Sequence, residues 1–506
     1  MMRYHGGDGA RGARMKLFGS RGKIVAVTFA GAVAFATVVL AAQASLSHDV
    51  STLPLRQGEV PPLARGQLIE SVACLADPAE TYALYLPSSY APTKRWPIIY
   101  AFDPMARGSR PLELYKDIAE KYGFVLAGSN SSRNFSPSES AKGATAMWND
   151  THTRIALDER RIYTTGFSGG ARFAGMIAMN CAHCKIAGVI AHGAGYPNNR
   201  KPGAKDNLLY FLAAGDEDFN WAEVMDVRRE REEAGEPYRV RGFSGPHQWA
   251  PSAVMEEAVE WMVLKAMQAS IQAPDGMLID QIFQQVRGEA EAAEKRGDTI
   301  AQLGAYRMLV SDFSGLQDVS EYEKKLAALK KSPALKTALG KERDQIVEQE
   351  RLQDEISPKL SAFAEGDQED PVALAREIAQ GLGRLRDQSL HARTEENRHV
   401  AMRAFRGLWA QGIEAGQMAY ELHHFDKAVD CFQLMSSVSD DAWPALLLAE
   451  AHAAQGGKKQ AMKSLREAVK RGLKNVEVFE KDPRLDSLHA DAEFQSLLAE
   501  LKRRQN

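Results

Sequence analysis

Short β-rich runs alternate with helical stretches between residues 67 and 268, and after about Ala269 the β-rich runs disappear. The run from Pro97 to Ala101 is continuously apolar, as expected of a strand buried on both faces of a sheet. Alternation at this spacing predicts an α/β fold: a mainly parallel sheet with helices on both faces, followed by an all-α part. The strands are expected at residues 82–86, 97–101, 124–128, 161–165, 187–191, 208–213 and 238–243.

The pentapeptide Gly166-Phe167-Ser168-Gly169-Gly170 matches the pattern G-x-S-x-G. A chain that turns sharply from strand to helix needs small residues there, because added side chains would collide with neighbouring backbone. A Gly/Ser-rich turn is the simpler interpretation, but a strand-like run precedes the motif and a helical run follows it. This context predicts that Ser168 is a nucleophile.

A catalytic acid and a base should follow this serine in the order Ser, Asp, His. Asp218 follows an apolar strand run, and His247 lies in a loop that contains Gly and Pro, after the run 238–243. These two residues are the predicted acid and base. The weaker candidates are Asp216 as the acid, which is also a typical turn residue, and His183 and His192 as the base, which precede the acid.

The three residues predict a triad in which the histidine takes the serine proton and the aspartate holds the imidazole tautomer. The oxyanion would be bound by the N–H of Gly169 and by an N–H of the loop at Phe102 and Asp103. This chemistry requires neither a cofactor nor a metal. No long insertion interrupts the α/β part, so we expect an open site.

On these residues the chain resembles the α/β-hydrolase superfamily, most of all the secreted esterases that include feruloyl esterases and polyhydroxybutyrate depolymerases. The resemblance covers residues 68–268 and rests on YALYLPSSYAPTKRWPIIYAF, LDERRIYTTGFSGGARFAGMIA, GDEDFN and GPHQW. The family commonly has His-Gly where this chain has Phe102-Asp103, which leaves only a backbone N–H as the second oxyanion donor.

The resemblance implies a serine hydrolase that cleaves carboxylic esters through an acyl-enzyme. Two alternatives stay open. One is a serine peptidase or amidase. The other is a catalytically silent hydrolase fold that acts, with the helical half, as a binding scaffold.

The N-terminus carries a positively charged segment, an apolar run from Ile24 to Ala42 and an A-x-A pattern at residues 42–44. These are the three parts of a secretory signal peptide. We therefore expect an upstream extension and signal over 1–45, a linker over 46–66, and a periplasmic or secreted protein. The run also approaches the length that spans a bilayer, so an uncleaved membrane anchor is the alternative.

Four cysteines in 506 residues are too few for a disulfide-built scaffold. Cys181 and Cys184 form a C-x-x-C pair, but they follow the nucleophile helix, which argues against a redox motif. Haem attachment lacks the following histidine, and zinc lacks two further ligands at a convincing spacing. The expected bridge joins Cys74 to Cys181 or Cys184, and Cys431 is expected to be a buried thiol.

The C-terminal half repeats itself. The pairs Trp409 and Trp443, Ala428 and Ala461, and Phe432 and Leu465 are spaced by 33 or 34 residues. This spacing resembles that of tetratricopeptide (TPR) repeats, which place small residues where two helices cross and large residues where repeats stack. A generic helical bundle is the alternative. We expect a helical region over 269–410 and TPR-like repeats with a capping helix over 411–506. Such repeats imply a protein or peptide partner, and a net charge of −3 gives no basic field for nucleic acid.

Overall fold

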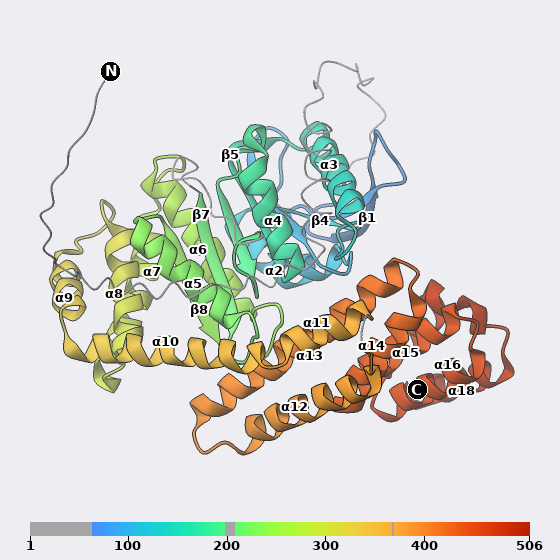
Figure 1. The fold of residues 1–506 in the computed structure, drawn as a ribbon. Coiled ribbons are helices and arrows are strands. Elements are labelled where there is room, and N and C mark those ends of the chain that lie inside the picture. Colours follow the sequence, from blue (N-terminus) through green and yellow to red (C-terminus); the bar gives the residue numbers. More distant parts are fainter. Residues whose placement is uncertain (1–62, 198–207, 367–368, 506) are drawn as a thin grey trace, which may run out of the picture.

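The computed structural model describes residues 63–197, 208–366 and 369–505 (Figure 1). The predicted signal over 1–45 and nearly all of the predicted linker lie outside these residues. The described chain begins with an α/β part and continues into a long helical half. Within the described ranges, no helix combines the length and the apolar character that crossing a membrane requires.

The strands of the described residues form one eight-stranded sheet in the order β1-β2-β4-β3-β5-β6-β7-β8. They are β1 (Leu68–Ala73), β2 (Thr81–Tyr85), β3 (Trp96–Phe102), β4 (Val125–Ser129), β5 (Leu157–Phe167), β6 (Gly188–His192), β7 (Leu209–Gly215) and β8 (Tyr238–Phe243). Strands β3 to β8 pair in parallel, whereas β2 is antiparallel to both β1 and β4. The predicted mainly parallel sheet is confirmed.

Helices cover both faces of this sheet, as β3 illustrates. They are α2 (Ser109–Tyr122), α3 (Pro137–Arg154), α4 (Gly169–Asn180), α5 (Trp221–Ala234) and α6 (Ser252–Gln268), with a short η1 (Ala182–Cys184) after α4. Ile99 packs into a core with α2 and α6, whereas its neighbours Ile98 and Tyr100 pack into a second core with α3, α4 and α5. Successive residues of a strand point to opposite faces, so one apolar run supplies both cores.

Strand β1 is the strand that the sequence analysis missed. Its sequence LIESVA contains exposed polar residues, and it lies at the edge of the sheet, where it pairs only with β2. An edge strand has one hydrogen-bonded neighbour and half-exposed side chains, so its apolar pattern is weak. The central strands are buried and gave the clear signal.

The helical half adds two further cores to the molecule. Its elements are α7 (Gly276–Arg296), α8 (Thr299–Phe313), α9 (Ser320–Lys330), α10 (Pro333–Asp354), α11 (Ser357–Glu365), α12 (Pro371–His391), α13 (Glu395–Glu421), α14 (Phe425–Val438), α15 (Ala442–Ala454), α16 (Lys458–Lys470), α17 (Val476–Lys481), η3 (Pro483–Leu488) and α18 (Ala492–Gln505). Helices α7 to α9 share the core of α2 and α6, so the α/β part continues structurally beyond residue 268. One further core joins α10 to α15, and another joins α15 to α18.

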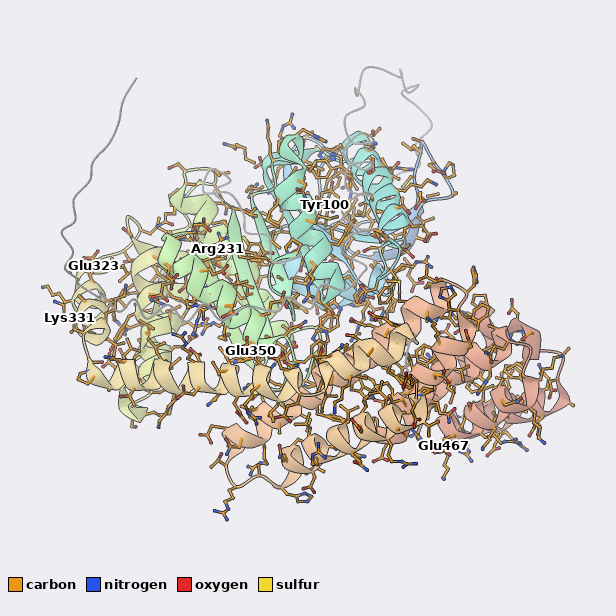
Figure 2. All side chains as sticks on the ribbon, viewed as in Figure 1. Tyr100, Arg231, Glu323, Lys331, Glu350 and Glu467 are labelled. Carbon is orange, nitrogen blue, oxygen red and sulfur yellow. A yellow bond between two sulfur atoms is a disulfide. The ribbon has the colours of Figure 1, made fainter. Side chains whose placement is uncertain are left out.

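Charged side chains cover the outside of the helical half, where Glu323, Lys331 and Glu350 are exposed (Figure 2). Tyr100 and Arg231 lie within the α/β part instead. The buried Arg231 guanidinium donates to the carbonyls of Leu208 and Pro237, which satisfies the charged group inside the core. In contrast to Arg231, the labelled charged residues of the helical half lie on its solvated surface.

The helices of the predicted repeats pack in consecutive pairs, α13 with α14 and α15 with α16. Gly412 and Gly416 of α13 leave no room for side chains: an added Cβ would lie 2.4 Å from Met435 Sδ and 2.5 Å from Phe432 Cε1. The rings of Trp409 and Trp443 are 6.0 Å apart. The predicted boundary at residue 410 falls inside α13, which therefore belongs to both regions.

Candidate active site

Ser168 connects β5 to α4 in a strained backbone conformation, with φ 53° and ψ −122°. A serine rarely adopts a positive φ, and such strain is characteristic of functional turns. The turn is tight because a Cβ on Gly166 would lie 2.3 Å from the backbone of Gly170. The N–H of Ser168 donates to the carbonyl of His192 at the end of β6, at 2.8 Å. The predicted sharp strand-to-helix turn is therefore present.

Asp218 and His247 are in direct contact. His247 Nδ1 lies 2.9 Å from Asp218 Oδ1, which also accepts the backbone N–H of Asn220 at 2.8 Å. The Asp218 side chain is fully buried, whereas His247 remains 15% exposed. The imidazole lies between the rings of Phe167 and Phe219, with centroids at 4.5 and 4.2 Å, so its orientation is fixed by packing as well as by the carboxylate.

The end of β6 adjoins each of the three predicted residues. The carbonyl of His192 accepts the Ser168 N–H, and the next residue, Gly193, touches both other residues. A Cβ on Gly193 would lie 2.9 Å from Asp218 Oδ2 and 3.0 Å from the imidazole of His247. Gly193 also has φ +61°, a conformation that favours glycine. The acid and the base are therefore in contact, and the serine adjoins them through its backbone, whereas among the described residues no hydrogen bond joins the Ser168 hydroxyl to His247.

The alternative residues have other roles. Asp216 Oδ1 accepts the backbone N–H of Gly245 at 2.9 Å, which ties together the loops that carry the acid and the base. His192 is fully buried, with Nε2 2.8 Å from Tyr115 Oη, and burial lowers its pKa to about 3. His183 is exposed, next to Cys181. The geometry therefore favours Asp218 and His247 over these candidates.

The two segments predicted to bind the oxyanion are in contact. A Cβ on Gly170 would lie 2.1 Å from the carbonyl oxygen of Phe102 and 3.4 Å from the backbone nitrogen of Asp103. Gly169 is the first residue of α4, where an N–H has no preceding carbonyl within the helix to bind. A Cβ on Gly169 would lie 1.9 Å from Asn134 Oδ1, which places this amide beside the turn.

The carboxylate of Asp103 points into the protein. It accepts hydrogen bonds from Arg107 Nε at 2.9 Å, Arg107 Nη2 at 3.0 Å, the Met105 N–H at 3.0 Å and Trp249 Nε1 at 3.2 Å. Asp103 is fully buried, and the guanidinium of Arg107 balances its charge. A carboxylate at this position is therefore compatible with an oxyanion-binding backbone.

The helical half covers the loop that carries the acid, although the sequence predicted an open site. Three backbone carbonyls of the loop accept side-chain hydrogen bonds from it. These bonds run from Arg403 Nη1 to Asp216 O (2.9 Å), from Arg406 Nη1 to Glu217 O (3.3 Å) and from Gln349 Nε2 to Phe219 O (3.0 Å). Burial lowers the pKa of Arg403 to about 10, although the nearby Asp216 and Asp218 favour its charged form. The residues that cover the loop lie more than 100 positions after it in the sequence, so the sequence of the α/β part does not indicate this contact.

Two groups near the site were not singled out by the sequence analysis. Arg172, in the first turn of α4, pairs with Glu223 of α5 at 2.5 Å. Glu414 of α13 is half-buried, and burial raises the pKa of its carboxyl group, while Arg172 and His247 act in the opposite direction. Both residues lie in helices whose patterns are explained by packing, so no local signal marks them.

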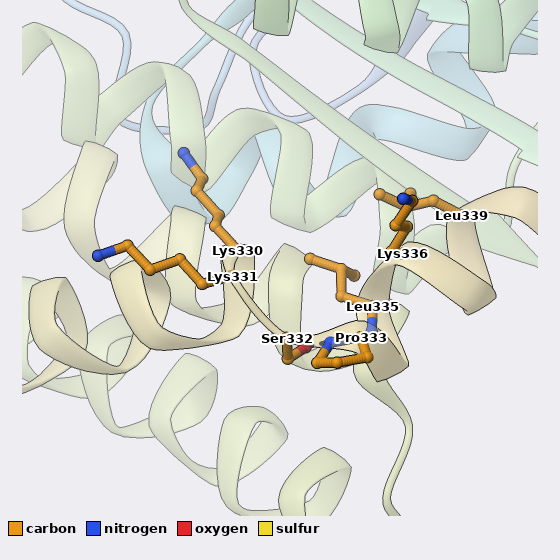
Figure 3. Close-up of a pocket in the computed structure, with 7 residues that line it drawn as sticks. All are labelled: Lys330, Lys331, Ser332, Pro333, Leu335, Lys336 and Leu339. Carbon is orange, nitrogen blue, oxygen red and sulfur yellow. Dashed lines mark hydrogen bonds between the residues drawn. The ribbon is translucent and has the colours of Figure 1, made fainter.

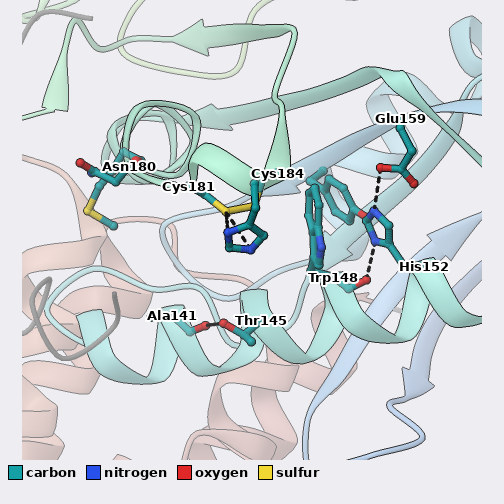
Figure 4. Close-up of a disulfide and its surroundings, with 11 residues drawn as sticks. Ala141, Thr145, Trp148, His152, Glu159, Asn180, Cys181 and Cys184 are labelled. Atoms are coloured by element: carbon teal, nitrogen blue, oxygen red, sulfur yellow. Dashed lines mark hydrogen bonds and ion pairs between the residues drawn. A yellow bond between two sulfur atoms is a disulfide. The ribbon is translucent and has the colours of Figure 1, made fainter. Parts of the chain in front are cut away.

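The disulfide joins Cys181 to Cys184, so the expected bridge to Cys74 is wrong (Figure 4). The bridge closes the C-x-x-C turn at the end of α4, next to the stacked rings of Trp148 and His152. Cys74 is a buried free thiol whose pKa burial raises to about 12, and Cys431 is also free and buried. With both sulfurs in a disulfide, the Cys181, His183 and Cys184 cluster offers no thiolates to a metal.

A hollow of about 540 Å³ lies at the junction of α9 and α10 (Figure 3). It is lined by Lys330, Lys331, Ser332, Pro333, Leu335, Lys336 and Leu339. The Ser332 hydroxyl accepts the Leu335 N–H and so caps α10. None of the predicted catalytic residues lines this hollow, and its lysines extend into solvent.

No protein-family model matches the sequence, and no curated protein is similar to it. Solved structures with a similar fold include a substrate-bound, fluorophosphonate-binding serine hydrolase F of Staphylococcus aureus, with 12% identity and a TM-score of 0.31 over 39% of this chain and 96% of that chain. A ferulic acid esterase is 14% identical, with a TM-score of 0.30, over 38% and 94% of the two chains. A Bacillus cereus carboxylesterase is 16% identical, with a TM-score of 0.30, over 36% and 93%. At these identities the likeness concerns the fold and does not extend to activity.

Proposed function

We propose that this chain is an exported serine hydrolase that cleaves carboxylic esters through an acyl-enzyme. The observation that carries the proposal is the strained Ser168, which is joined through the end of β6 to the Asp218 and His247 pair. A positive φ at a serine is costly and persists where the surrounding structure enforces it. A binding scaffold would have no need for a strained serine at the turn that adjoins, through the end of β6, a histidine bound to a buried carboxylate.

In the proposed mechanism, His247 accepts the Ser168 proton as the hydroxyl oxygen attacks the ester carbonyl, and then gives the proton to the departing alcohol. Asp218 accepts the Nδ1–H of His247, which leaves Nε2 as the proton acceptor. Backbone N–H groups of Gly169 and of the segment at Asp103 stabilise the tetrahedral oxyanion. Water then attacks the acyl-enzyme with the same histidine as base.

The test compares wild type with Ser168→Ala on short-chain p-nitrophenyl esters, together with labelling by a fluorophosphonate probe. Loss of the serine should lower kcat by roughly 10⁴- to 10⁶-fold and abolish labelling. A matched control in the preceding strand, β5, is Thr165→Ser, which keeps the buried hydroxyl group that donates to Ile190 O. This variant should retain both turnover and labelling. No Ser168-dependent turnover of these esters, combined with no labelling of the wild type, favours the silent scaffold.

Export is a further part of the proposal. The apolar run and A-x-A pattern support a cleaved signal, and a disulfide between Cys181 and Cys184 suits an oxidising compartment. Fractionation of the native host followed by mass spectrometry of the N-terminus tests it. A mature chain that begins shortly after residue 44 supports periplasmic or secreted localisation. An intact N-terminus in the membrane fraction would indicate an anchor, and one in the cytosol would contradict export.

We also propose that the C-terminal helices are TPR-like repeats that bind a protein or peptide. The close approach of Gly412 and Gly416 to α14 and the 33- to 34-residue spacing support this interpretation. Selection of a peptide library on the full chain tests it. Enriched peptides that share a motif and bind in a purified system support the proposal, whereas no enrichment over an unrelated helical protein contradicts it.

A further inference from the structure

One face of α13 contacts the acid loop and also includes Glu414. Arg403 and Gly407 contact the loop: Arg403 binds the Asp216 carbonyl, and a Cβ on Gly407 would lie 3.4 Å from Phe219 Cβ. Glu414 follows Gly407 by two helical turns. At 100° per residue, Glu414 projects within about 20° of the direction of Arg403 and of Gly407. It lies about 10 Å beyond Gly407 along the helix axis. The carboxyl group therefore belongs to the face of α13 that covers the site.

The surroundings of Glu414 agree with this placement. Phe219, which the α13 face contacts, packs against His247 at 4.2 Å. Arg172 and His247 both act electrostatically on Glu414, which brings the α4 turn and the base into its neighbourhood. The side chain is half-buried, and it makes no hydrogen bond or ion pair with another described residue. The Glu414 oxygens are not among the buried polar atoms that lack a partner, so water reaches them, and a cationic group that displaces this water gains a charge-assisted hydrogen bond.

The charges around the site are predominantly acidic. Arg172 is already paired with Glu223, and Arg406 with Glu217, so neither guanidinium is left to pair with Glu414 alone. The carboxyl group therefore adds negative charge to a site that already holds the buried Asp218, although Arg403 lies close to Asp216 and Asp218. A partly enclosed site with an excess of one sign concentrates ligands of the opposite sign.

We propose that Glu414 is a specificity-determining residue that selects esters carrying a cationic group, such as an ammonium group, and that the helical half thereby supplies part of the substrate site. The inference rests on the proposed ester hydrolase function. The cation lies on the substrate at a distance from the reacting carbonyl, so Glu414 binds it without taking part in bond making. The helical half then serves substrate recognition in addition to any partner binding.

Matched esters test this proposal on the full chain. Acetylcholine is compared with its neutral isostere 3,3-dimethylbutyl acetate, which probes a cation in the alcohol part. The p-nitrophenyl ester of 6-aminohexanoate is compared with that of heptanoate, which probes a cation in the acyl part. Wild type should prefer the cationic member of at least one pair in kcat/KM. The substitution Glu414→Gln should reduce that preference roughly 10- to 100-fold, as expected for loss of a hydrogen bond or ion pair to a charged group.

The control is Glu421→Gln, which removes the same charge from the same helix at a carboxyl group bound to Arg484. It should leave the preference unchanged. If Glu414→Gln does not fold, the wild-type preference must still weaken as salt screens the charges, and Glu414→Asp must retain part of it. Equal preference in wild type and Glu414→Gln, or no cation preference in wild type, overturns the inference. In either case Ser168-dependent hydrolysis of p-nitrophenyl acetate would leave the proposed function intact, whereas its absence overturns both.

Discussion

The role of Asp218 can be tested by Asp218→Asn. Its Oδ1 accepts hydrogen bonds from His247 Nδ1 and from the Asn220 N–H, so the variant's amide oxygen has two donors that hold it in the same place. The imidazole should therefore keep its orientation, and the substitution should remove mainly the negative charge. Two unit charges about 4 Å apart interact by about 4 kcal/mol at an effective dielectric constant of about 20. The imidazolium that forms in the transition state loses this stabilisation, which lowers kcat roughly 10³-fold.

The assay is steady-state hydrolysis of p-nitrophenyl acetate, with far-UV circular dichroism as the check of folding. Within the described part of the chain, Asp218 Oδ2 has no hydrogen-bond partner, so a neutral amide should not destabilise the fold through a lost bond at that atom. Asp216→Asn is the matched control, because among the described residues the Asp216 side chain accepts only the Gly245 N–H, and this variant should lose less than about 10-fold. Full activity in Asp218→Asn, with a 10³-fold loss in Asp216→Asn, would refute the assignment of the acid.

Three other predictions concern the oxyanion segment, the disulfide and the repeats. Gly170→Ala places a Cβ 2.1 Å from the Phe102 carbonyl and should lower kcat by about 10²- to 10³-fold, whereas Gly288→Ala, where nothing lies within 4 Å, should leave kcat unchanged; equal kinetics for both would contradict the contact. Replacing Cys181 and Cys184 together by Ser opens a very short loop and should cost about 2 kcal/mol in urea unfolding, a difference that reductant should abolish in the wild type; equal midpoints without reductant would mean that the bridge does not stabilise the fold. Burial and the nearby Asp482 raise the pKa of Glu450 from 4.5 to about 7, although Arg484 acts in the opposite direction. Between these two pH values the folded protein therefore holds a proton on Glu450 that the unfolded chain has released. Wild type should therefore lose about 3 kcal/mol of stability as the pH rises from about 4.5 to 7, and Glu450→Gln should lack that loss in urea melts; parallel pH profiles would refute this.

The features that the sequence predicted are those with a local cause. A strand followed by G-x-S-x-G and a helix constrains its own backbone, and Ser168 indeed has the strained turn that the motif indicates. The expected chain order of Ser, Asp and His predicted Asp218 as the acid and His247 as the base, and these two side chains are in contact. The buried central strands were recognisable because both of their faces are apolar, whereas the edge strand β1 was not.

The features that the sequence analysis missed depend on contacts between distant segments. Arg403 binds a carbonyl at residue 216, and nothing near either residue indicates that they meet. Glu414 follows the ordinary pattern of an amphipathic helix, so its position relative to the acid loop becomes clear only once the packing of α13 against that loop is known. Disulfide pairing has the same limitation, because the spacing of four cysteines does not decide which of them lie close together.

The long helix α13 limits where the chain can be truncated to give a folded fragment. Its first half satisfies carbonyls beside the acid, and its second half, through Gly412 and Gly416, packs into the repeats. A cut at residue 268 would strip α7 to α9 from the core that they share with the sheet and leave three loop carbonyls without their donors. A cut at residue 410 would divide a continuous helix. The smallest fragment that retains an intact acid loop therefore extends at least to the end of α13, and the two halves are best studied as one piece.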